Sequence, residues 1–282
     1  RRRGGECHGS GEDDRMSNDV TRNVRIVFAG ATGKTGGAVA RALLDAPDVT
    51  IAGAVARRHA GQDLGTVLGR GPLGVVIDGE VAPALDRTGA DVLVDFTTPE
   101  AGEAHVRAAL ARGVSVVLGT TGVSFVTLEE LGREAEGREA AVLAIANFSL
   151  GAMLLARFAR EAAELLGAVE IIEKHHATKR DAPSGTALRL AEAVARAAGR
   201  DAVPVHSVRL PGLVAHHEII FGNAGETLTL KHDTISRDSF APGVRMAVLT
   251  ASGFRGLVTD FEAVFRAYRH GVAAGQTPAS LA

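Results

Sequence analysis

Two adjacent histidines and a nearby lysine are the residues of this sequence best suited to chemistry. His175 and His176 can each exchange a proton near neutral pH, and Lys179, a few residues later, carries a standing positive charge. Together in one short stretch, these groups suit proton donation to an anionic substrate. The alternative is that they are ordinary polar residues on the protein surface.

A helix start follows this cluster directly. Ser184 comes just before apolar residues at helical spacing over 187–198. The backbone N–H groups of Gly185 and Thr186 therefore fall in the first helical turn, where they have no partner within the helix and where the helix dipole favours an anion. We expect a carboxylate or phosphate to bind there, on a loop that follows a short strand over 169–173. The alternative is a helix cap without a ligand.

A second candidate site lies near the start of the chain. A β-rich run over 24–29 is followed by glycines at positions 30, 33 and 36 and then by a helical run over 38–44. A dinucleotide-binding unit needs strand, glycine turn and helix in this order, because the glycines let the backbone approach the pyrophosphate closely. We therefore predict that the phosphates of a dinucleotide bind at the start of that helix.

Two details narrow the choice of this ligand. The segment 33–35 resembles the end of a P-loop, but Phe28 stands where a P-loop requires glycine, which argues against that interpretation. After the next β-rich run, 49–55, come Arg57 and Arg58. Arginine at this place suits the 2′-phosphate of NADP, whereas an acidic residue would hold the ribose hydroxyls of NAD. We therefore predict NADPH as the preferred cofactor and NADH as the alternative.

Alternating strands and helices predict the fold of the first half. Apolar runs over 90–96, 114–118 and 141–146 are typical of buried strands, and helical segments separate them. Such alternation predicts an α/β fold with a Rossmann-type, doubly wound parallel sheet. Because ligands bind such sheets at the carboxyl ends of the strands, we expect the polar loops there to line a nicotinamide ribose.

After residue 147 the β-rich runs are separated by turns that contain glycine or proline. They cover 205–210, 215–221, 227–232 and 244–250 and follow a long helical segment over 152–166. We predict a second, α+β domain with a mostly antiparallel or mixed open sheet. The expected organisation is a disordered leader over 1–23, a dinucleotide-binding domain over 24–147 completed by a C-terminal helix at about 256–282, and a substrate-binding and oligomerisation domain over 148–255.

Composition and charge limit the possible partners and location. The formal net charge is −2 and basic residues form no cluster, so no nucleic-acid partner is expected. No apolar run is long enough to span a membrane, so we expect a soluble protein without a membrane partner. The single cysteine, Cys7, fits a reducing, cytoplasmic setting. The leader lacks the apolar core of a secretory signal, and Met16 is the expected start of translation.

The stretch 173–187, taken as a whole, resembles the signature of one enzyme family. It fits the pattern E-x-H-H-x-x-K-x-D-A-P-S-G-T-A at every fixed position. Further matching segments are Asp95–Glu100, Gly119–Gly122, Ala146–Ser149 and Leu210–Glu218. From Val24 to Leu281 the chain resembles the 4-hydroxy-tetrahydrodipicolinate reductase (dihydrodipicolinate reductase) family, which belongs to the diaminopimelate route to lysine.

This resemblance implies hydride transfer from NAD(P)H to a cyclic, imine-derived dicarboxylate in a homotetramer built by the open sheet. It implies that His175 is the general acid and that Lys179 is a second proton donor or a charge stabiliser. The residues implied to hold the substrate carboxylate are His176, Ser184, Gly185 and Thr186. Together with Arg57, the expected cofactor-binding residues are Gly30, Ala31, Thr32, Gly33, Lys34, Thr35, Gly119, Thr120, Thr121, Ile145, Ala146, Asn147 and Phe148.

One departure from the family and three alternatives stay open. Ala56 stands where many members have an acidic residue, which weakens the expectation of NADH preference. Another NAD(P)-dependent dehydrogenase of a small amino or keto acid, or a nucleotide-sensing module without turnover, could share this domain plan. A metal site could use the two histidine pairs, 175–176 and 216–217, with Glu218. No metal is expected, because adjacent histidines on a strand point to opposite faces.

Overall fold

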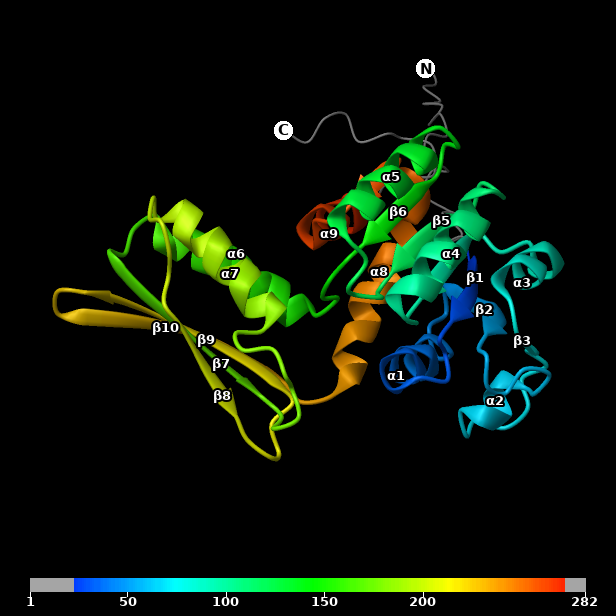
Figure 1. Cartoon of the computed structure of the whole chain (residues 1–282), viewed down its shortest axis with the longest axis horizontal. Coiled ribbons are helices and arrows are strands. Elements are labelled where there is room, and N and C mark those ends of the chain that lie inside the picture. The colour runs from blue at the N-terminus through cyan, green and yellow to red at the C-terminus, as the bar shows by residue number, and fades with distance from the viewer. Residues whose placement is uncertain (1–22, 272–282) are drawn as a thin grey trace, which may run out of the picture.

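The computed structural model describes residues 23–271, which form two lobes (Figure 1). The leader expected over 1–23 lies outside the described residues except for Asn23, and so does the end of the expected C-terminal segment, 272–282. The larger lobe contains the N-terminal strands, and the smaller lobe contains a second sheet with two helices beside it (Figure 1). No helix among residues 23–271 has both the length and the apolar character that crossing a membrane requires.

The larger lobe is built on a seven-stranded parallel sheet with the order β11-β6-β5-β4-β1-β2-β3. Its strands are β1 (Val24–Ala29), β2 (Val49–Val55), β3 (Ile77–Asp78), β4 (Val92–Asp95), β5 (Ser115–Leu118), β6 (Ala141–Ala144) and β11 (Gly256–Val258). The central strands are buried on both faces, which explains why they appear in the sequence as continuous apolar runs. The predicted Rossmann-type sheet is confirmed.

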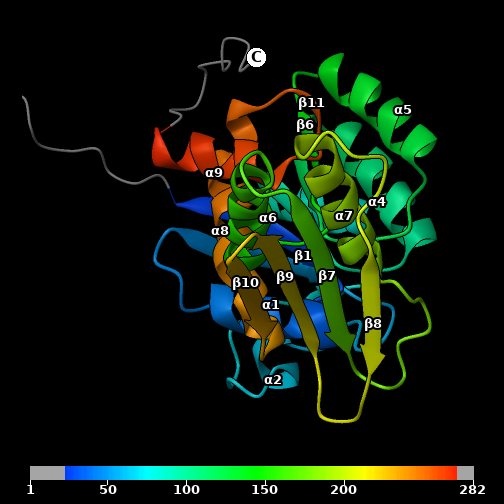
Figure 2. The same cartoon turned by 90° about the vertical axis from the view of Figure 1, so that its left-hand side faces the viewer.

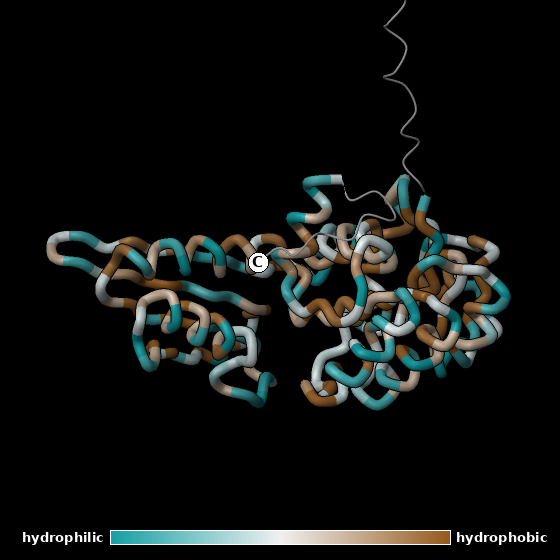
Figure 3. The backbone as a smooth tube through the Cα atoms, turned by 90° about the horizontal axis from the view of Figure 1, so that it is seen from above, coloured by the Kyte–Doolittle hydropathy of each residue, from teal (hydrophilic) through white to brown (hydrophobic). Residues whose placement is uncertain are grey.

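Helices cover both faces of this sheet. They are α1 (Lys34–Leu43), α2 (Leu64–Val67), α3 (Val81–Thr88), α4 (Pro99–Leu110), α5 (Phe125–Glu136), α8 (Ala241–Thr250) and α9 (Phe261–Arg269), with short 3₁₀ turns η1 (Arg237–Phe240) and η2 (Ala251–Gly253). One buried cluster joins the sheet to α1, α8 and α9, and a second joins it to α3, α4 and α5. Apolar segments run through the interior of this lobe (Figure 3).

The segment 244–250 differs from its prediction, because it forms the helix α8 rather than a strand. Pro242 lies in its first turn, where a missing N–H costs nothing. Val244, Ala247 and Val248 are buried at helical spacing in the core of the first sheet. This helix was expected in the second domain, but its packing joins it to the first. A short apolar run does not distinguish a buried helix from a buried strand, which explains the error.

The smaller lobe contains a four-stranded mixed sheet with the order β10-β9-β7-β8 (Figure 2). Its strands are β7 (Ala168–His175), β8 (Val205–Arg209), β9 (Ala215–Asn223) and β10 (Glu226–Thr234). β7 pairs with β8 in parallel and with β9 in antiparallel orientation. The helices α6 (Leu150–Ala163) and α7 (Gly185–Ala197) pack on one face of the sheet through a shared apolar cluster. The predicted mixed open sheet is confirmed.

Candidate active site

A cavity of about 300 Å³ lies at the carboxyl ends of the first sheet's strands. The strand order reverses between β1 and β4, and this is where open α/β sheets bind their ligands. The lining comes from the segments after β4, β5 and β6, from α1 and from η1. The lining residues are Thr35, Phe96, Thr97, Gly119, Thr120, Thr121, Ala146, Asn147, Phe148 and Phe240. Seven of these were predicted as cofactor residues, whereas Phe96, Thr97 and Phe240 were not.

The glycine turn after β1 is packed too tightly for side chains. Gly30 has a positive φ of 83°, and a Cβ there would come within 2.4 Å of the Phe96 carbonyl oxygen. A Cβ on Gly36 would lie 2.2 Å from the Gly30 carbonyl oxygen. Helix α1 begins at Lys34, earlier than predicted, because Gly33 is its N-cap and the next glycines are helical. The first-turn N–H groups of α1 therefore begin directly at this turn, as a phosphate site requires.

Two cations near this turn are available to a ligand. Arg57 follows β2, and the end of β2 adjoins the turn because the Gly30 N–H donates to the Val55 carbonyl at 2.9 Å. Within residues 23–271, neither Arg57 nor Lys34 has a hydrogen-bond or ion-pair partner, and both are exposed. The positions of these residues fit a phosphorylated dinucleotide, although neither of them lines the cavity.

The end of β7 places the predicted acid beside a buried carboxylate. Residues two apart on a strand share a face, so Glu173 and His175 both point towards the helix-covered side, where both are buried. The His175 Nδ1 and a Glu173 carboxylate oxygen are hydrogen-bonded. Arg209, at the end of the neighbouring strand β8, donates to the same carboxylate in a bidentate pair at 2.6 and 3.0 Å. The carboxylate thereby holds the His175 ring in one orientation.

The same carboxylate connects the strand to the helix that follows. The Ser184 N–H donates to Glu173 at 3.2 Å, and the Ser184 hydroxyl oxygen caps α7 by accepting from the Ala187 N–H at 3.2 Å. Arg209 also donates to the Asp181 carbonyl at 2.7 Å, inside the loop between strand and helix. These bonds fix both ends of the loop that contains the predicted catalytic residues.

Burial and the bound charges set the pKa values of this cluster. Desolvation raises the pKa of Glu173, but hydrogen bonds from Arg209, Ser207 and His175 outweigh it and lower the pKa to about 2. The pKa of His175 is lowered, mainly by burial and also by the charges of Lys179 and Arg209, against the opposing effect of Glu173. Glu173 is thus an anion at neutral pH, so it accepts a hydrogen bond from the Nδ1–H group of His175. The other ring nitrogen of His175, Nε2, stays available for a ligand.

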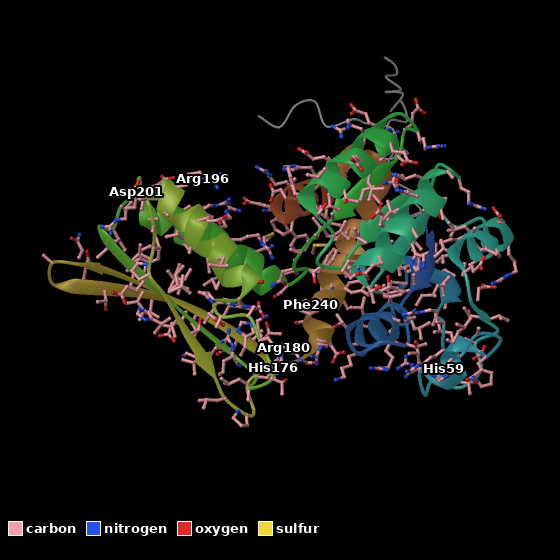
Figure 4. The ribbon with its side chains drawn as sticks, viewed as in Figure 1. His59, His176, Arg180, Arg196, Asp201 and Phe240 are labelled. Carbon is pink, nitrogen blue, oxygen red and sulfur yellow. The ribbon has the colours of Figure 1, made fainter. Side chains whose placement is uncertain are left out.

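The other predicted loop residues lie closer to solvent. Lys179 is half-buried and pairs with Asp181 at 2.8 Å, and the His176 Nδ1 lies 2.8 Å from the Thr178 hydroxyl. His176 and Arg180 lie at the end of the second sheet that faces the larger lobe, and Phe240 lies on the segment that joins the two lobes (Figure 4).

A second cavity, of about 210 Å³, is lined by residues of both lobes. Thr186 from the start of α7 lines it together with Ile145, Ala146 and Asn147 from the loop after β6. Of the predicted substrate residues only Thr186 lines this cavity, and the predicted catalytic pair lines neither cavity. The structure thus brings one predicted substrate residue, Thr186, next to the predicted cofactor loop.

His217 is a second buried histidine beside His175, and the sequence did not assign it to this site. It stands opposite Glu173 in the β7–β9 register, and its ring meets His175 edge-on with centroids 5.5 Å apart. It also lines the second cavity, and its Nε2 is buried without a hydrogen-bond partner among the described residues. Burial, with a smaller effect from the charge of His175, lowers the pKa of His217 to about 4.

The low pKa of His217 predicts a pH-dependent stability. Between pH 6.5 and 4 the unfolded chain binds a proton at this residue and the folded chain does not, so the free energy of unfolding falls as pH falls through this range, by about 3 kcal/mol. The variant His217→Gln should therefore show a flatter dependence there, measured by chemical denaturation at several pH values. His206→Gln, which changes an exposed histidine, is the matched control. An equal slope in His217→Gln and wild type would contradict this assignment.

The histidine pairs 175–176 and 216–217 form no metal site within the described residues. His216 points away from His217 and bonds to Asp233 on β10 at 2.7 Å. Among residues 23–271 no group of three or more histidine, cysteine, aspartate or glutamate side chains is placed to hold a metal ion.

Comparison with known proteins identifies relatives over almost the entire described chain. Residues 24–148 match the family model described as dihydrodipicolinate reductase, N-terminus, and residues 151–265 match its C-terminus model. The 4-hydroxy-tetrahydrodipicolinate reductase of Moorella thermoacetica is 42% identical over 85% of this chain and 97% of the relative. That of Symbiobacterium thermophilum is 48% identical over 79% of this chain and 90% of the relative.

Solved structures give the same result. Dipicolinate-bound dihydrodipicolinate reductase from Paenisporosarcina sp. TG-14 superposes with a TM-score of 0.75 at 31% identity, over 85% of this chain and 98% of that one. An amine dehydrogenase from Mycobacterium smegmatis, with a TM-score of 0.65 at 18% identity over 84% of this chain and 95% of that one, shares the fold alone. Since both halves match the family's models and relatives above 40% identity span most of their own length, this chain belongs to the dihydrodipicolinate reductase family.

Proposed function

We propose that this chain is an NAD(P)H-dependent oxidoreductase that converts 4-hydroxy-tetrahydrodipicolinate to tetrahydrodipicolinate, in the diaminopimelate route to lysine. The reaction takes up one hydride from NAD(P)H and one proton, and the 4-hydroxyl group leaves as water. The observation that carries the proposal is the buried Glu173–His175–Arg209 cluster next to the start of α7, because it combines an oriented imidazole with an anion-binding helix terminus. The family relatives that bear this reductase's name support the same reaction.

The cofactor is proposed to bind along the carboxyl ends of the first sheet. The turn Gly30–Thr35 would hold its phosphates, since the turn leaves the N–H groups of α1 accessible and excludes side chains. The loops Gly119–Thr121 and Ile145–Phe148 would hold the nicotinamide half, since they line the two cavities. Bound NAD(P)H supplies the hydride for the reduction.

The substrate is proposed to be held by its carboxylates at the start of α7. The Paenisporosarcina relative was solved with dipicolinate, a flat dicarboxylate. In this chain the N–H groups of Gly185 and Thr186 begin a thirteen-residue helix, capped by Ser184, and His176 is the first residue of the loop that leads to it. Donors in a helix's first turn orient a carboxylate before the reaction begins.

His175 is proposed to deliver the proton and Lys179 to assist it. The bond from Nδ1 to Glu173 leaves Nε2 to face the substrate, and a dianion beside it would counter the desolvation that lowers the pKa of His175. Lys179 would stabilise negative charge on the substrate or supply a second proton. General acid assistance of this kind typically accelerates a reaction about 10²–10⁴-fold.

NADPH is proposed as the preferred cofactor because Arg57 has no hydrogen-bond or ion-pair partner within residues 23–271 and because Ala56, not an acidic residue, precedes it. We expect a lower KM for NADPH than for NADH at matched ionic strength, and we expect Arg57→Ala to raise the KM for NADPH roughly tenfold with little change for NADH. Initial rates with both cofactors would measure this, with Arg70→Ala, another exposed arginine, as control. A clear NADH advantage in kcat/KM for the wild-type protein would overturn the preference.

The domains and assembly complete the proposal. We propose a dinucleotide-binding domain over 24–147, completed by the C-terminal helix, and a substrate-binding domain that starts at 148. The uncovered face of the second sheet would form the contacts of a homotetramer, which light scattering on the purified chain would detect. A cytoplasmic location is proposed from the biosynthetic reaction.

The activity itself is tested by the oxidation of NADPH in a coupled assay. Freshly generated 4-hydroxy-tetrahydrodipicolinate should support a decrease in absorbance that neither pyruvate nor another small keto acid supports. Turnover of the keto acids alone would favour a different dehydrogenase, and NADPH binding without turnover would favour a sensing module.

A further inference from the structure

Asp95 is the last residue of β4, and its fully buried side chain is surrounded by hydrogen-bond donors. One carboxylate oxygen, Oδ1, accepts from the Thr97 hydroxyl at 2.8 Å, the Thr120 hydroxyl at 2.6 Å and the Thr97 N–H at 3.0 Å. The other, Oδ2, lies 2.7 Å from the Nδ1 of His105 on α4. A buried carboxylate with this many donors is fully satisfied.

These bonds determine where the two hydroxyl protons point. A carboxylate can only accept, so Thr97 and Thr120 must each donate their single hydroxyl proton to Asp95. The Thr97 N–H also donates to the Thr120 hydroxyl oxygen at 2.7 Å. The Thr120 hydroxyl proton therefore cannot point towards Thr97 and is directed to Asp95. Both hydroxyl oxygens therefore keep only lone pairs for any further partner.

Thr97 and Thr120 both line the 300 Å³ cavity that the proposed function assigns to the nicotinamide half of the cofactor. We propose that Asp95 is a positioning residue that holds these two hydroxyl groups as fixed hydrogen-bond acceptors for a donor group on that half of the cofactor. The inference rests on the proposed function, because it takes this cavity as the cofactor site.

The nicotinamide half offers two kinds of donor, the carboxamide N–H and the ribose hydroxyls. Both are recognised by the same chemistry, an oxygen acceptor whose proton is already engaged. A threonine hydroxyl that is not held by Asp95 could rotate and donate its proton to the ligand instead. Such a hydroxyl would bind a ligand whether or not the ligand has a hydrogen-bond donor at this place. A hydroxyl held by Asp95 cannot do so, and it therefore selects for a ligand that donates.

Isothermal titration calorimetry with three ligands tests this role without relying on turnover. The ligands are NADPH, its 3-acetylpyridine analogue, which lacks the carboxamide N–H, and an analogue that lacks a hydroxyl on the nicotinamide ribose. The wild-type protein should bind at least one of the two analogues about tenfold more weakly than NADPH, and the affected analogue identifies the donor.

Two substitutions of Asp95 separate its acceptor role from its charge. Asp95→Ala removes the acceptor of the two threonine hydroxyl protons. This variant should therefore bind that analogue and NADPH with nearly equal affinity. Asp95→Asn keeps an oxygen that both hydroxyl groups can donate to, so it should retain most of the discrimination. His105→Gln, on the other carboxylate oxygen, should leave it unchanged.

The double variants Thr97→Val/Thr120→Val and Thr97→Ser/Thr120→Ser decide the matter if Asp95→Ala does not fold. Valine removes both acceptors and should weaken NADPH binding roughly tenfold with a loss of discrimination, whereas serine should preserve both the affinity and the discrimination. Discrimination that persists in a folded Asp95→Ala or in the double valine variant, or its absence from the wild-type protein, would overturn the inference. A wild-type protein that binds none of the three ligands would instead contradict the cofactor site of the proposed function.

Discussion

Replacing His175 by glutamine or Lys179 by alanine should lower kcat by orders of magnitude while the fold and the affinity for NADPH stay unchanged. We expect about 10²–10⁴-fold for His175→Gln, the usual contribution of general acid assistance. Both side chains belong to the second sheet and its loop, and neither lines the cavity proposed for the nicotinamide. Cofactor binding should therefore be unaffected by their removal, as calorimetry with NADPH would show.

The Lys179 variant should differ from the His175 variant in its kinetic constants. Lys179 is partly solvent-exposed and would contact the substrate both before and during the reaction, so Lys179→Ala should also raise the KM for the substrate. His206→Gln and Lys231→Ala change exposed residues of the same sheet and serve as controls. Near wild-type kcat in both active-site variants would rule out the proposed proton chemistry.

Replacing Glu173 by glutamine should reduce both activity and stability. The amide would leave the half-buried Arg209 guanidinium without its anion. Breaking a fully buried ion pair in this way typically costs about 3–5 kcal/mol of unfolding free energy, and we expect the lower end of this range because Arg209 keeps some contact with water. It would also release the His175 ring from its fixed orientation, for which we expect a loss of about 10²-fold in kcat. Denaturant unfolding and steady-state kinetics measure the two effects.

The pH dependence separates Glu173 from His217. The pKa of Glu173 is lowered to about 2 from an ordinary value of 4.5, so its stabilising contribution is complete above pH 4.5 and is lost as pH falls towards 2. Glu173→Gln should therefore flatten the stability curve below pH 4.5 and keep the decrease between pH 6.5 and 4.5 that His217 causes. Glu170→Gln, on the other face of β7, is the matched control. A Glu173→Gln protein with wild-type stability and kcat would contradict the role of this carboxylate.

The sequence predicted the parts of this fold that local patterns determine. Buried strands such as β1 and β4 appear as apolar runs. The glycines after β1 predicted a tight turn, and in the structure a Cβ on Gly36 would collide with the Gly30 carbonyl. The run 244–250 was predicted wrongly because it is apolar on nearly every side, and only its packing against α1 and the first sheet shows that it is a helix.

The residues missed at the candidate site are those that reach it from distant parts of the chain. Arg209 lies 36 residues after Glu173 and meets it only because β8 pairs with β7 in parallel. His217 arrives opposite Glu173 through the antiparallel pairing of β9. Strand register, which no local pattern in the sequence specifies, decides both contacts. Glu173 itself was within the recognised signature, but its role became visible only with these partners in place.

The most direct test of the proposed reaction follows one labelled atom. NADPH that carries deuterium at the transferring C4 position would be incubated with the full chain and freshly generated 4-hydroxy-tetrahydrodipicolinate, and the product would be analysed by mass spectrometry. The proposed reaction predicts tetrahydrodipicolinate with one deuterium per NADPH oxidised. Unlabelled product, or no oxidation of NADPH under conditions where the chain is folded and binds the cofactor, would contradict it.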